Sequence, residues 1–185
     1  MAEHLSQNFT LDEMLFSETA KNKGISNSPT DVHKKVLKHT CQYLLEPLRA
    51  LLNTKYKSYR GKAVKYTILN VTSGYRSEKL NKAVNGASSS QHCKGEAADI
   101  EAVLVFTDGT KKVLFYNELY EDIKSWVRAK KLSVDQCIQE RSYNKKTGVW
   151  AYWVHVSHSS WGASKDRKQF LKYNNGIYGL DCVLK

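Results

Sequence analysis

A histidine and an aspartate seven positions apart are the first residues in the chain that could do chemistry. His92 and Asp99 lie on either side of Gly95, within the segment SSSQHCKGEAADI that ends at Ile100. Imidazole nitrogens and carboxylate oxygens bind zinc when a third ligand comes from elsewhere in the fold. The spacing is too long for one helical turn, so we expect a loop that turns at Gly95 and presents Asp99 at the start of a strand. The alternative is a surface histidine beside a strand-end aspartate.

A second histidine occurs in the apolar segment YWVHVS, which ends at Ser157. Side chains in a strand alternate between two faces, so Trp153, His155 and Ser157 share one face. A histidine in such a position is often a core residue whose hydrogen bonds are satisfied. Two imidazoles and one carboxylate would instead bind zinc and leave its fourth position open for water, which is the catalytic arrangement.

Glu140 and Arg76 are the charged residues that could act beside such a site. Glu140 precedes a predicted hairpin and falls opposite Ala151, Trp153 or His155, depending on the loop length. An odd-numbered partner places it on the face of His155, where its carboxylate could take a proton from zinc-bound water. Arg76 follows a strand-to-helix turn and could hold a substrate carboxylate or stabilise an oxyanion. The alternatives are a solvated strand-end glutamate and a surface arginine.

The elements that must position these residues mix helices and strands without a regular alternation. Apolar residues at helical spacing predict helices over residues 31–52 and 117–131, and Pro47 should kink or break the first of them. The segments predicted as strands are residues 66–72, 97–106, 136–143 and 149–157. Residues 1–30 are polar and loop-like apart from a short helix entry capped by Thr10. We therefore expect an α+β fold, in a single domain with a mainly antiparallel sheet and flanking helices.

Length and charge restrict the class of protein further. The 185 residues suit one domain, with a motif-bearing core over about residues 5–157 and a C-terminal extension over 158–185. The formal net charge of +11 fits a nucleic acid, an anionic membrane or an anionic polymer such as the bacterial cell wall. The basic residues are spread along the chain without a nucleic-acid motif. No apolar run approaches the roughly 18 residues of a membrane span.

The two ends of the chain and its cysteines carry weaker signals. Residues 1–8 contain no basic head followed by an apolar core, so no secretory signal is visible. The four cysteines form no C-x-x-C pair and are expected to be free thiols. Beyond the motifs, Phe170, Tyr173 and Tyr178 could line a wall-binding surface, but we expect them to be packing residues.

The motifs also occur together in a characteristic order. They are SGYRS from Ser73, SQHxxGxAxDI from Ser90, the pair Asp135-Gln136 ahead of Glu140, and WVHVS from Trp153. In this combination the chain closely resembles the zinc D-Ala-D-Ala carboxypeptidase-like metallopeptidases. That family includes phage L-alanyl-D-glutamate endolysins and shares its fold with the hedgehog signalling domain. The resemblance extends over most of the chain.

The resemblance implies a role for each matching residue. The residues that would bind one zinc ion per chain are His92, Asp99 and His155. Arg76 would help to bind or polarise the substrate at the scissile bond. Ser90 would orient a ligand, because metal-binding groups normally need a hydrogen-bond partner behind them.

The catalytic acid departs from the pattern of many family members. They carry it three residues before the last histidine, and here that residue is Tyr152, which cannot act as a carboxylate base. A subgroup with an Asp-Gln-x-Ile-x-Glu segment ahead of WVHVS matches instead, and this match points to Glu140.

The function implied by the resemblance is zinc-dependent hydrolysis of peptide bonds involving D-amino acids in the peptidoglycan stem peptide. Such an enzyme would be a phage-type endolysin or a cell-wall remodelling enzyme, of the carboxypeptidase or the endopeptidase type. The alternative is an inactive, zinc-containing wall-binding module of the same fold. We expect a monomer whose partner is the anionic wall rather than nucleic acid or a membrane. It would be cytoplasmic in the producing cell and released later, or associated with a virion.

Overall fold

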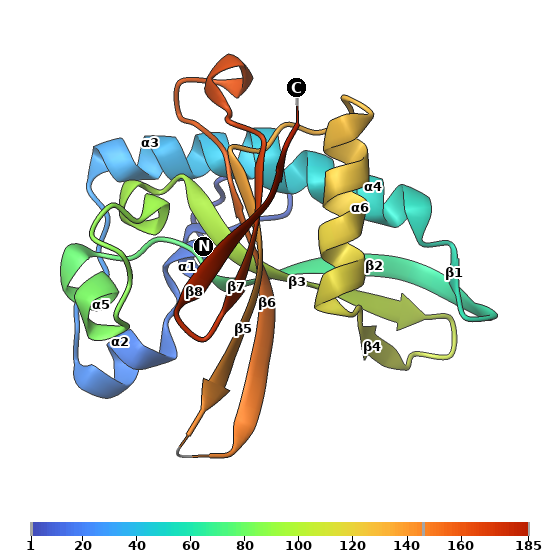
Figure 1. Ribbon diagram of the computed structural model, residues 1–185, viewed down its shortest axis with the longest axis horizontal. Coiled ribbons are helices and arrows are strands. Elements are labelled where there is room, and N and C mark those ends of the chain that lie inside the picture. Colours follow the sequence, from blue (N-terminus) through green and yellow to red (C-terminus); the bar gives the residue numbers. More distant parts are fainter. Residues whose placement is uncertain (1, 146, 185) are drawn as a thin grey trace.

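A mixed sheet of eight strands organises the protein in a computed structural model, which describes residues 2–145 and 147–184 (Figure 1). The strands run in the order β1-β2-β3-β6-β5-β7-β8, and β4 pairs with β3 beside this path. Their bounds are β1 Ser58–Tyr59, β2 Lys62–Ser73, β3 Ala97–Phe106, β4 Lys111–Val113, β5 Gln136–Asn144, β6 Val149–Ser157, β7 Gln169–Asn174 and β8 Ile177–Val183. Among these pairs, β5 and β7 are parallel and the others are antiparallel. The expected single α+β domain with a mainly antiparallel sheet is confirmed.

Six α-helices, one π-helical turn and two 3₁₀ turns accompany the sheet within the described residues. Their bounds are α1 Leu11–Leu15, α2 Glu18–Lys23, α3 Asp31–Thr40, η1 Cys41–Leu45, α4 Glu46–Lys55, α5 Glu78–Ala83, η2 Gln91–Lys94, α6 Tyr116–Arg128 and η3 Ala163–Lys165. The segments α3, η1 and α4 are continuous, so the helix expected from residue 31 does not break. The irregularity expected near Pro47 is the π-helical turn η1, where the Glu46 N–H donates to the Cys41 carbonyl five residues earlier. A widened turn at this point accommodates a residue that has no N–H of its own.

Neighbouring residues on β3 and β6 face opposite sides of the sheet. Ile100 and Val154 are register partners, and both are fully buried in the apolar core with residues of η1, α4 and α6. Asp99 and His155 are partners one position away, and their side chains emerge on the other side. One face of the central strands therefore builds the core, and the other face is free to build a polar site.

The N-terminal segment is more ordered than its polar composition predicts. Thr10 caps α1 in a capping box with Glu13, as expected. The prediction of a loop was wrong for α2, because the Ser17 hydroxyl accepts the Ala20 N–H at its start and Gly24 ends it in a left-handed conformation. The core residue Met14 holds the turn after β2 through its carbonyl, which accepts the Tyr75 N–H at 2.7 Å.

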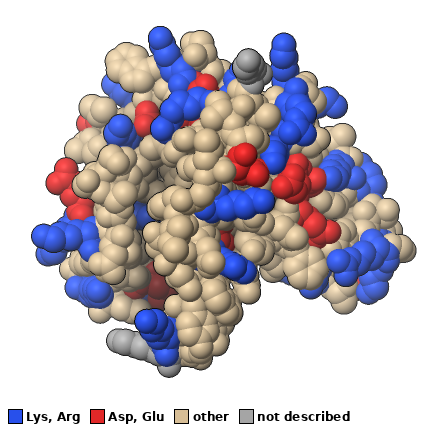
Figure 2. Space-filling view, viewed as in Figure 1, with Lys and Arg blue, Asp and Glu red and all other residues tan. Residues whose placement is uncertain are grey.

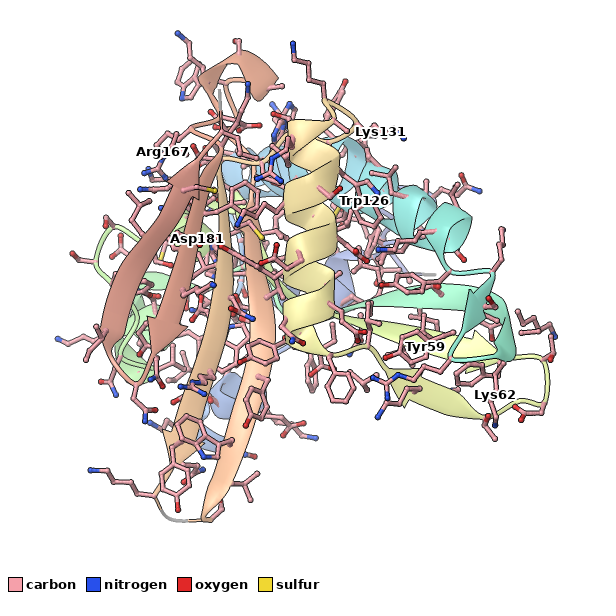
Figure 3. The ribbon with its side chains drawn as sticks, turned by 45° about the vertical axis from the view of Figure 1, so that its right-hand side comes forward. Tyr59, Lys62, Trp126, Lys131, Arg167 and Asp181 are labelled. Carbon is pink, nitrogen blue, oxygen red and sulfur yellow. The ribbon has the colours of Figure 1, made fainter. Side chains whose placement is uncertain are left out.

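The residues that follow Ser157 continue the same sheet. They form β7, which lies parallel to β5, and β8, which closes the edge. Asp181 of β8 points toward α6, where it accepts hydrogen bonds from Lys124 at 2.5 Å and from the Tyr120 hydroxyl at 3.0 Å (Figure 3). Phe170 is fully buried in the core, which confirms the packing role expected for it.

The cysteines match a further expectation. Cys41, Cys93, Cys137 and Cys182 are free thiols. Within the described part of the chain, no helix is both long enough and apolar enough to cross a bilayer.

Candidate metal centre

Three buried side chains converge on the polar face of the sheet. His92 comes from η2, Asp99 from the start of β3 and His155 from β6. Asp99 Oδ1 lies 3.2 Å from His92 Nε2 and 3.1 Å from His155 Nδ1. The two ring nitrogens are 3.1 Å apart. One ligand atom from each residue thus lies within 4.8 Å of the others, as three ligands of a single ion require.

Gly95 brings two of these residues together, as its position in the motif predicts. It ends η2 with φ of 79°, a left-handed conformation that favours glycine. A Cβ at this position would lie 3.1 Å from Leu37 and 3.3 Å from the His33 carbonyl oxygen. The chain therefore turns tightly against α3 and delivers Asp99 to the metal centre a few residues later.

A backbone carbonyl orients the His92 ring. His92 Nδ1 lies 2.6 Å from the Gly74 carbonyl oxygen, which can only accept a hydrogen bond. Nδ1 therefore carries a proton, and Nε2 is the nitrogen that faces the centre. Gly74 itself is pressed against α1, since a Cβ there would lie 2.4 Å from the Met14 carbonyl oxygen. The glycine of the SGYRS motif is the sequence signal for this contact.

Ser90, the residue expected to orient a ligand, lies just before η2. Its backbone carbonyl accepts the Cys93 N–H at 3.1 Å. The orienting contact on His92 comes from Gly74 instead, and the role of Ser90 stays a prediction.

Arg76 is tied to the metal centre. Its Nη2 donates to Asp99 Oδ2 at 2.5 Å, and its Nε donates to the Ser73 hydroxyl at 3.0 Å. Burial by itself would raise the pKa of Asp99, but His92 and His155 outweigh it and hold the pKa well below its usual range. Asp99 is therefore ionised, with one oxygen on Arg76 and the other directed at the two imidazoles.

Glu140 lies on the same face of the sheet, one strand beyond His155. Its register partner on β6 is Trp153, which is one of the odd-numbered partners expected. Burial raises the pKa of Glu140 to about 7, with a contribution from Asp99, while His155 and Arg76 oppose the rise. A carboxylate that titrates near neutral pH can both accept and return a proton.

The three converging side chains, with Arg76 and Glu140, line a cleft of about 1060 Å³. One wall includes the end of β2 at Ser73 and the loops and turns around η2, and the other consists of strands β5 to β8. Figure 2 shows this face of the molecule hollowed beside the strands, with acidic atoms recessed in the hollow. The three candidate ligands therefore face a cleft rather than the closed apolar core.

Two features of the cleft were missed by sequence reasoning. Gln91 donates to Asp135 at 2.9 Å, and Asp135 also accepts from Arg167, so three distant segments are fastened together beside His92. Gln91 and Asp135 both belong to the motifs, which was the available signal. Tyr173 and Tyr178 line the cleft, whereas packing was the role expected for them.

The donor set fits a zinc ion. His92, Asp99 and His155 offer two imidazole nitrogens and one carboxylate oxygen, a recognised set of zinc ligands that leaves a fourth position for water. The fixed tautomer of His92 and the ionised state of Asp99 suit this role without rearrangement.

Comparison with known proteins supplies the family. The family model described as Peptidase M15 matches residues 7–114, which include Arg76, His92 and Asp99. No curated protein and no solved structure matches the chain. Peptidases of this family are zinc-dependent, in agreement with the ligands that converge in the cleft. The chain therefore belongs to the peptidase M15 family, the zinc D-Ala-D-Ala carboxypeptidase-like metallopeptidases.

Proposed function

We propose that the protein hydrolyses peptide bonds involving D-amino acids in the peptidoglycan stem peptide, as a phage-type endolysin or a cell-wall remodelling enzyme. The observation that carries this proposal is the convergence of His92, Asp99 and His155 in an open cleft beside Glu140. Membership of a family of zinc peptidases that act on peptidoglycan-type substrates supports it.

His92, Asp99 and His155 would hold one zinc ion, which when bound activates a water molecule and polarises the scissile carbonyl. Glu140 accepts the proton that the attacking water loses and returns it to the leaving amine. Its pKa of about 7 suits both transfers near neutral pH. Arg76, held by Asp99 and Ser73, directs positive charge toward the oxygen on which negative charge develops.

The test is a digestion of purified peptidoglycan by the zinc-loaded protein, followed through the release of new amino groups. His92→Ala and Asp99→Ala should abolish the release, because each removes a ligand. His4→Ala, at an exposed histidine outside the cleft, should leave it unchanged. Full activity in both ligand variants would contradict the proposal.

The alternative is a wall-binding module without activity, and Tyr152 is the feature that raises it. Its side chain lies on the face of β6 opposite His155 and contacts Tyr116, with ring centroids 4.8 Å apart. Glu140→Gln separates the two functions. An active wild type that loses cleavage in this variant supports the peptidase, whereas wall binding without cleavage in both proteins supports the module.

The charge of the chain supports an anionic wall as the partner of a monomeric enzyme. Lys and Arg are spread over the visible face in Figure 2 rather than gathered into a stripe, as they would be along a nucleic-acid groove. A basic surface raises the local concentration of enzyme at an anionic polymer. Storage in the cytoplasm with later release to the wall, or carriage by a virion, is part of the same proposal.

A further inference from the structure

The last two strands of the sheet form an apolar wall beside Glu140. The residues that lie next to one another across β6, β5, β7 and β8 are Trp153, Glu140, Tyr173 and Tyr178. In the adjacent row, Ile138 of β5 pairs with His155 of β6 on one side and with Leu171 of β7 on the other. We call Leu171, Tyr173 and Tyr178 the C-terminal shelf, because all three line the cleft beyond Glu140.

The C-terminal shelf is accessible and uncharged. Tyr178 is 58% exposed, and its ring lies 4.6 Å from that of Tyr173 between centroids. Among the described residues, the lysines and arginines that line the cleft are Arg76, Lys94 and Arg167, and none of them belongs to β7 or β8. A substrate on the shelf therefore meets an aromatic and aliphatic surface that carries no cation of its own.

Arg76 is near enough to act on Tyr178 of the shelf, but its guanidinium is already paired with Asp99. Arg167 is paired with Asp135, which is five residues before Glu140 and so roughly 16 Å from it along the strand direction. Lys172 of β7 lies 3.8 Å from Asp181, which faces α6. A carboxylate placed on the shelf would thus lose solvent, while Arg76, Arg167 and Lys172 already have carboxylate partners.

The positions of Arg76 and Glu140 set the direction of the substrate. Arg76 contacts Asp99 from the β2 side of the metal centre, whereas Glu140 lies on the β5 side of His155. Arg76 suits the scissile carbonyl oxygen, and Glu140 protonates the leaving amine. The residues that follow the scissile bond therefore extend away from Glu140 over the shelf.

The width of the C-terminal shelf exceeds one amino acid. β7 and β8 lie one and two strand spacings beyond β5, which amounts to about 10 Å. An extended residue spans about 3.5 Å, so the shelf accommodates two to three residues after the scissile bond. It is also held in place, because Asp181 fastens β8 to Lys124 and Tyr120 of α6 (Figure 3).

We infer that the protein is an endopeptidase, which binds at least two residues on the leaving side of the scissile bond against the C-terminal shelf. This inference rests on the proposed peptidase function. A carboxypeptidase would release a single amino acid whose free carboxylate would lie on the uncharged shelf. An endopeptidase places an uninterrupted, uncharged backbone there instead.

The first test identifies the products. The zinc-loaded wild type is incubated with intact peptidoglycan and, separately, with a stem pentapeptide that ends in D-Ala-D-Ala, and the products are analysed by mass spectrometry. The inference predicts leaving fragments of two or more residues. Free D-alanine as the main product would overturn it while leaving the peptidase function intact. No cleavage of either substrate would contradict the proposed function itself.

The second test measures the C-terminal shelf directly. Binding of an uncleaved substrate peptide to zinc-loaded Glu140→Gln is measured by calorimetry, with and without a second substitution. Adding Tyr178→Ala should raise Kd about tenfold through the loss of a buried aromatic contact. Adding Tyr66→Ala, which removes a tyrosine that is 43% exposed on β2 outside the cleft, should leave Kd within about twofold. Equal Kd values for these two double variants, both shown to be folded by thermal denaturation, would overturn the inference.

Discussion

The two walls of the cleft hold their functional residues by different means. On the wall formed by loops and turns, hydrogen bonds fix the side chains: the Gly74 carbonyl orients His92, and Ser73 and Asp99 hold Arg76. On the wall formed by strands, register and burial place Glu140, which has no hydrogen-bond donor within the described residues. The hydrogen bonds of the first wall serve the candidate metal centre, whereas the second wall, which also supplies His155, places a proton acceptor and offers a surface to a substrate.

Replacing the buried acid should separate these two roles most sharply. Glu140→Gln should lower kcat by about a thousandfold, since general-base catalysis contributes about 10²–10⁴-fold. Zinc affinity, measured by competition with a chromogenic chelator, should stay within about twofold because the ligands and their partners are untouched. A large loss of zinc affinity in Glu140→Gln would show that the two walls are not independent.

The same residue should make the stability of the zinc-free protein depend on pH. Burial raises the pKa of Glu140 from 4.5 to about 7, so the folded state binds its proton more tightly than the unfolded state. This stabilisation of the folded state amounts to about 3 kcal/mol. It is fully present below pH 4.5 and is lost as pH rises through 7.

Urea unfolding of wild type and Glu140→Gln between pH 4.5 and 8 measures this effect. Relative to the variant, the wild type should lose free energy of unfolding as pH rises across this range. Glu3→Gln, at an exposed glutamate, serves as the control. If the free energies of unfolding of wild type and Glu140→Gln changed in parallel with pH, burial would not raise the pKa of Glu140.

The other wall should respond to a change in backbone packing. A Cβ at Gly74 would collide with the Met14 carbonyl and displace the oxygen that holds His92. Gly74→Ala should therefore weaken zinc binding by about 10–100-fold, the usual cost of disturbing a partner behind a ligand.

A matched glycine separates this effect from a general loss of stability. Gly109 has φ of 82° and open space around it, so Gly109→Ala strains the backbone without touching the metal centre. Calorimetric titration of both variants with zinc makes the comparison. Unchanged affinity in Gly74→Ala would remove the structural role assigned to that carbonyl.

The smallest effect concerns the surface outside both walls. The net charge of +11 should draw the enzyme to an anionic wall, and salt should weaken that attraction. Binding to insoluble peptidoglycan, measured by co-sedimentation, should fall severalfold between about 50 and 300 mM salt as the screening length shortens. Binding that is insensitive to salt would show that the charge does not steer the protein to the wall.

Sequence reasoning identified the three candidate ligands that the structure brings together, because these residues lie in local patterns. The alternation of apolar residues gave the bounds of β3 and β6, and these bounds fix which faces Asp99 and His155 occupy. Gly95 indicated the turn between the candidate ligands His92 and Asp99. The sequence left three possible register partners for Glu140, because the register of a hairpin depends on its loop and is fixed only by the fold.

The features that were missed depend on contacts between distant segments. The role of the Gly74 carbonyl follows from packing against Met14, sixty positions earlier in the chain. β7 pairs with β5 in parallel. Parallel strands are not joined by a tight hairpin turn, so no turn motif in the sequence indicates that these two strands pair. The position of Tyr173 beside Glu140 is a consequence of that pairing and was therefore hidden in the sequence.

The central claim is that His92, Asp99 and His155 form one zinc site. Anomalous diffraction at the zinc absorption edge, from crystals of the zinc-loaded protein, tests it most directly. We predict one peak per chain, at about 2.0–2.2 Å from His92 Nε2, Asp99 Oδ1 and His155 Nδ1. A peak bound by other residues, or no peak within reach of these three atoms, would contradict the account.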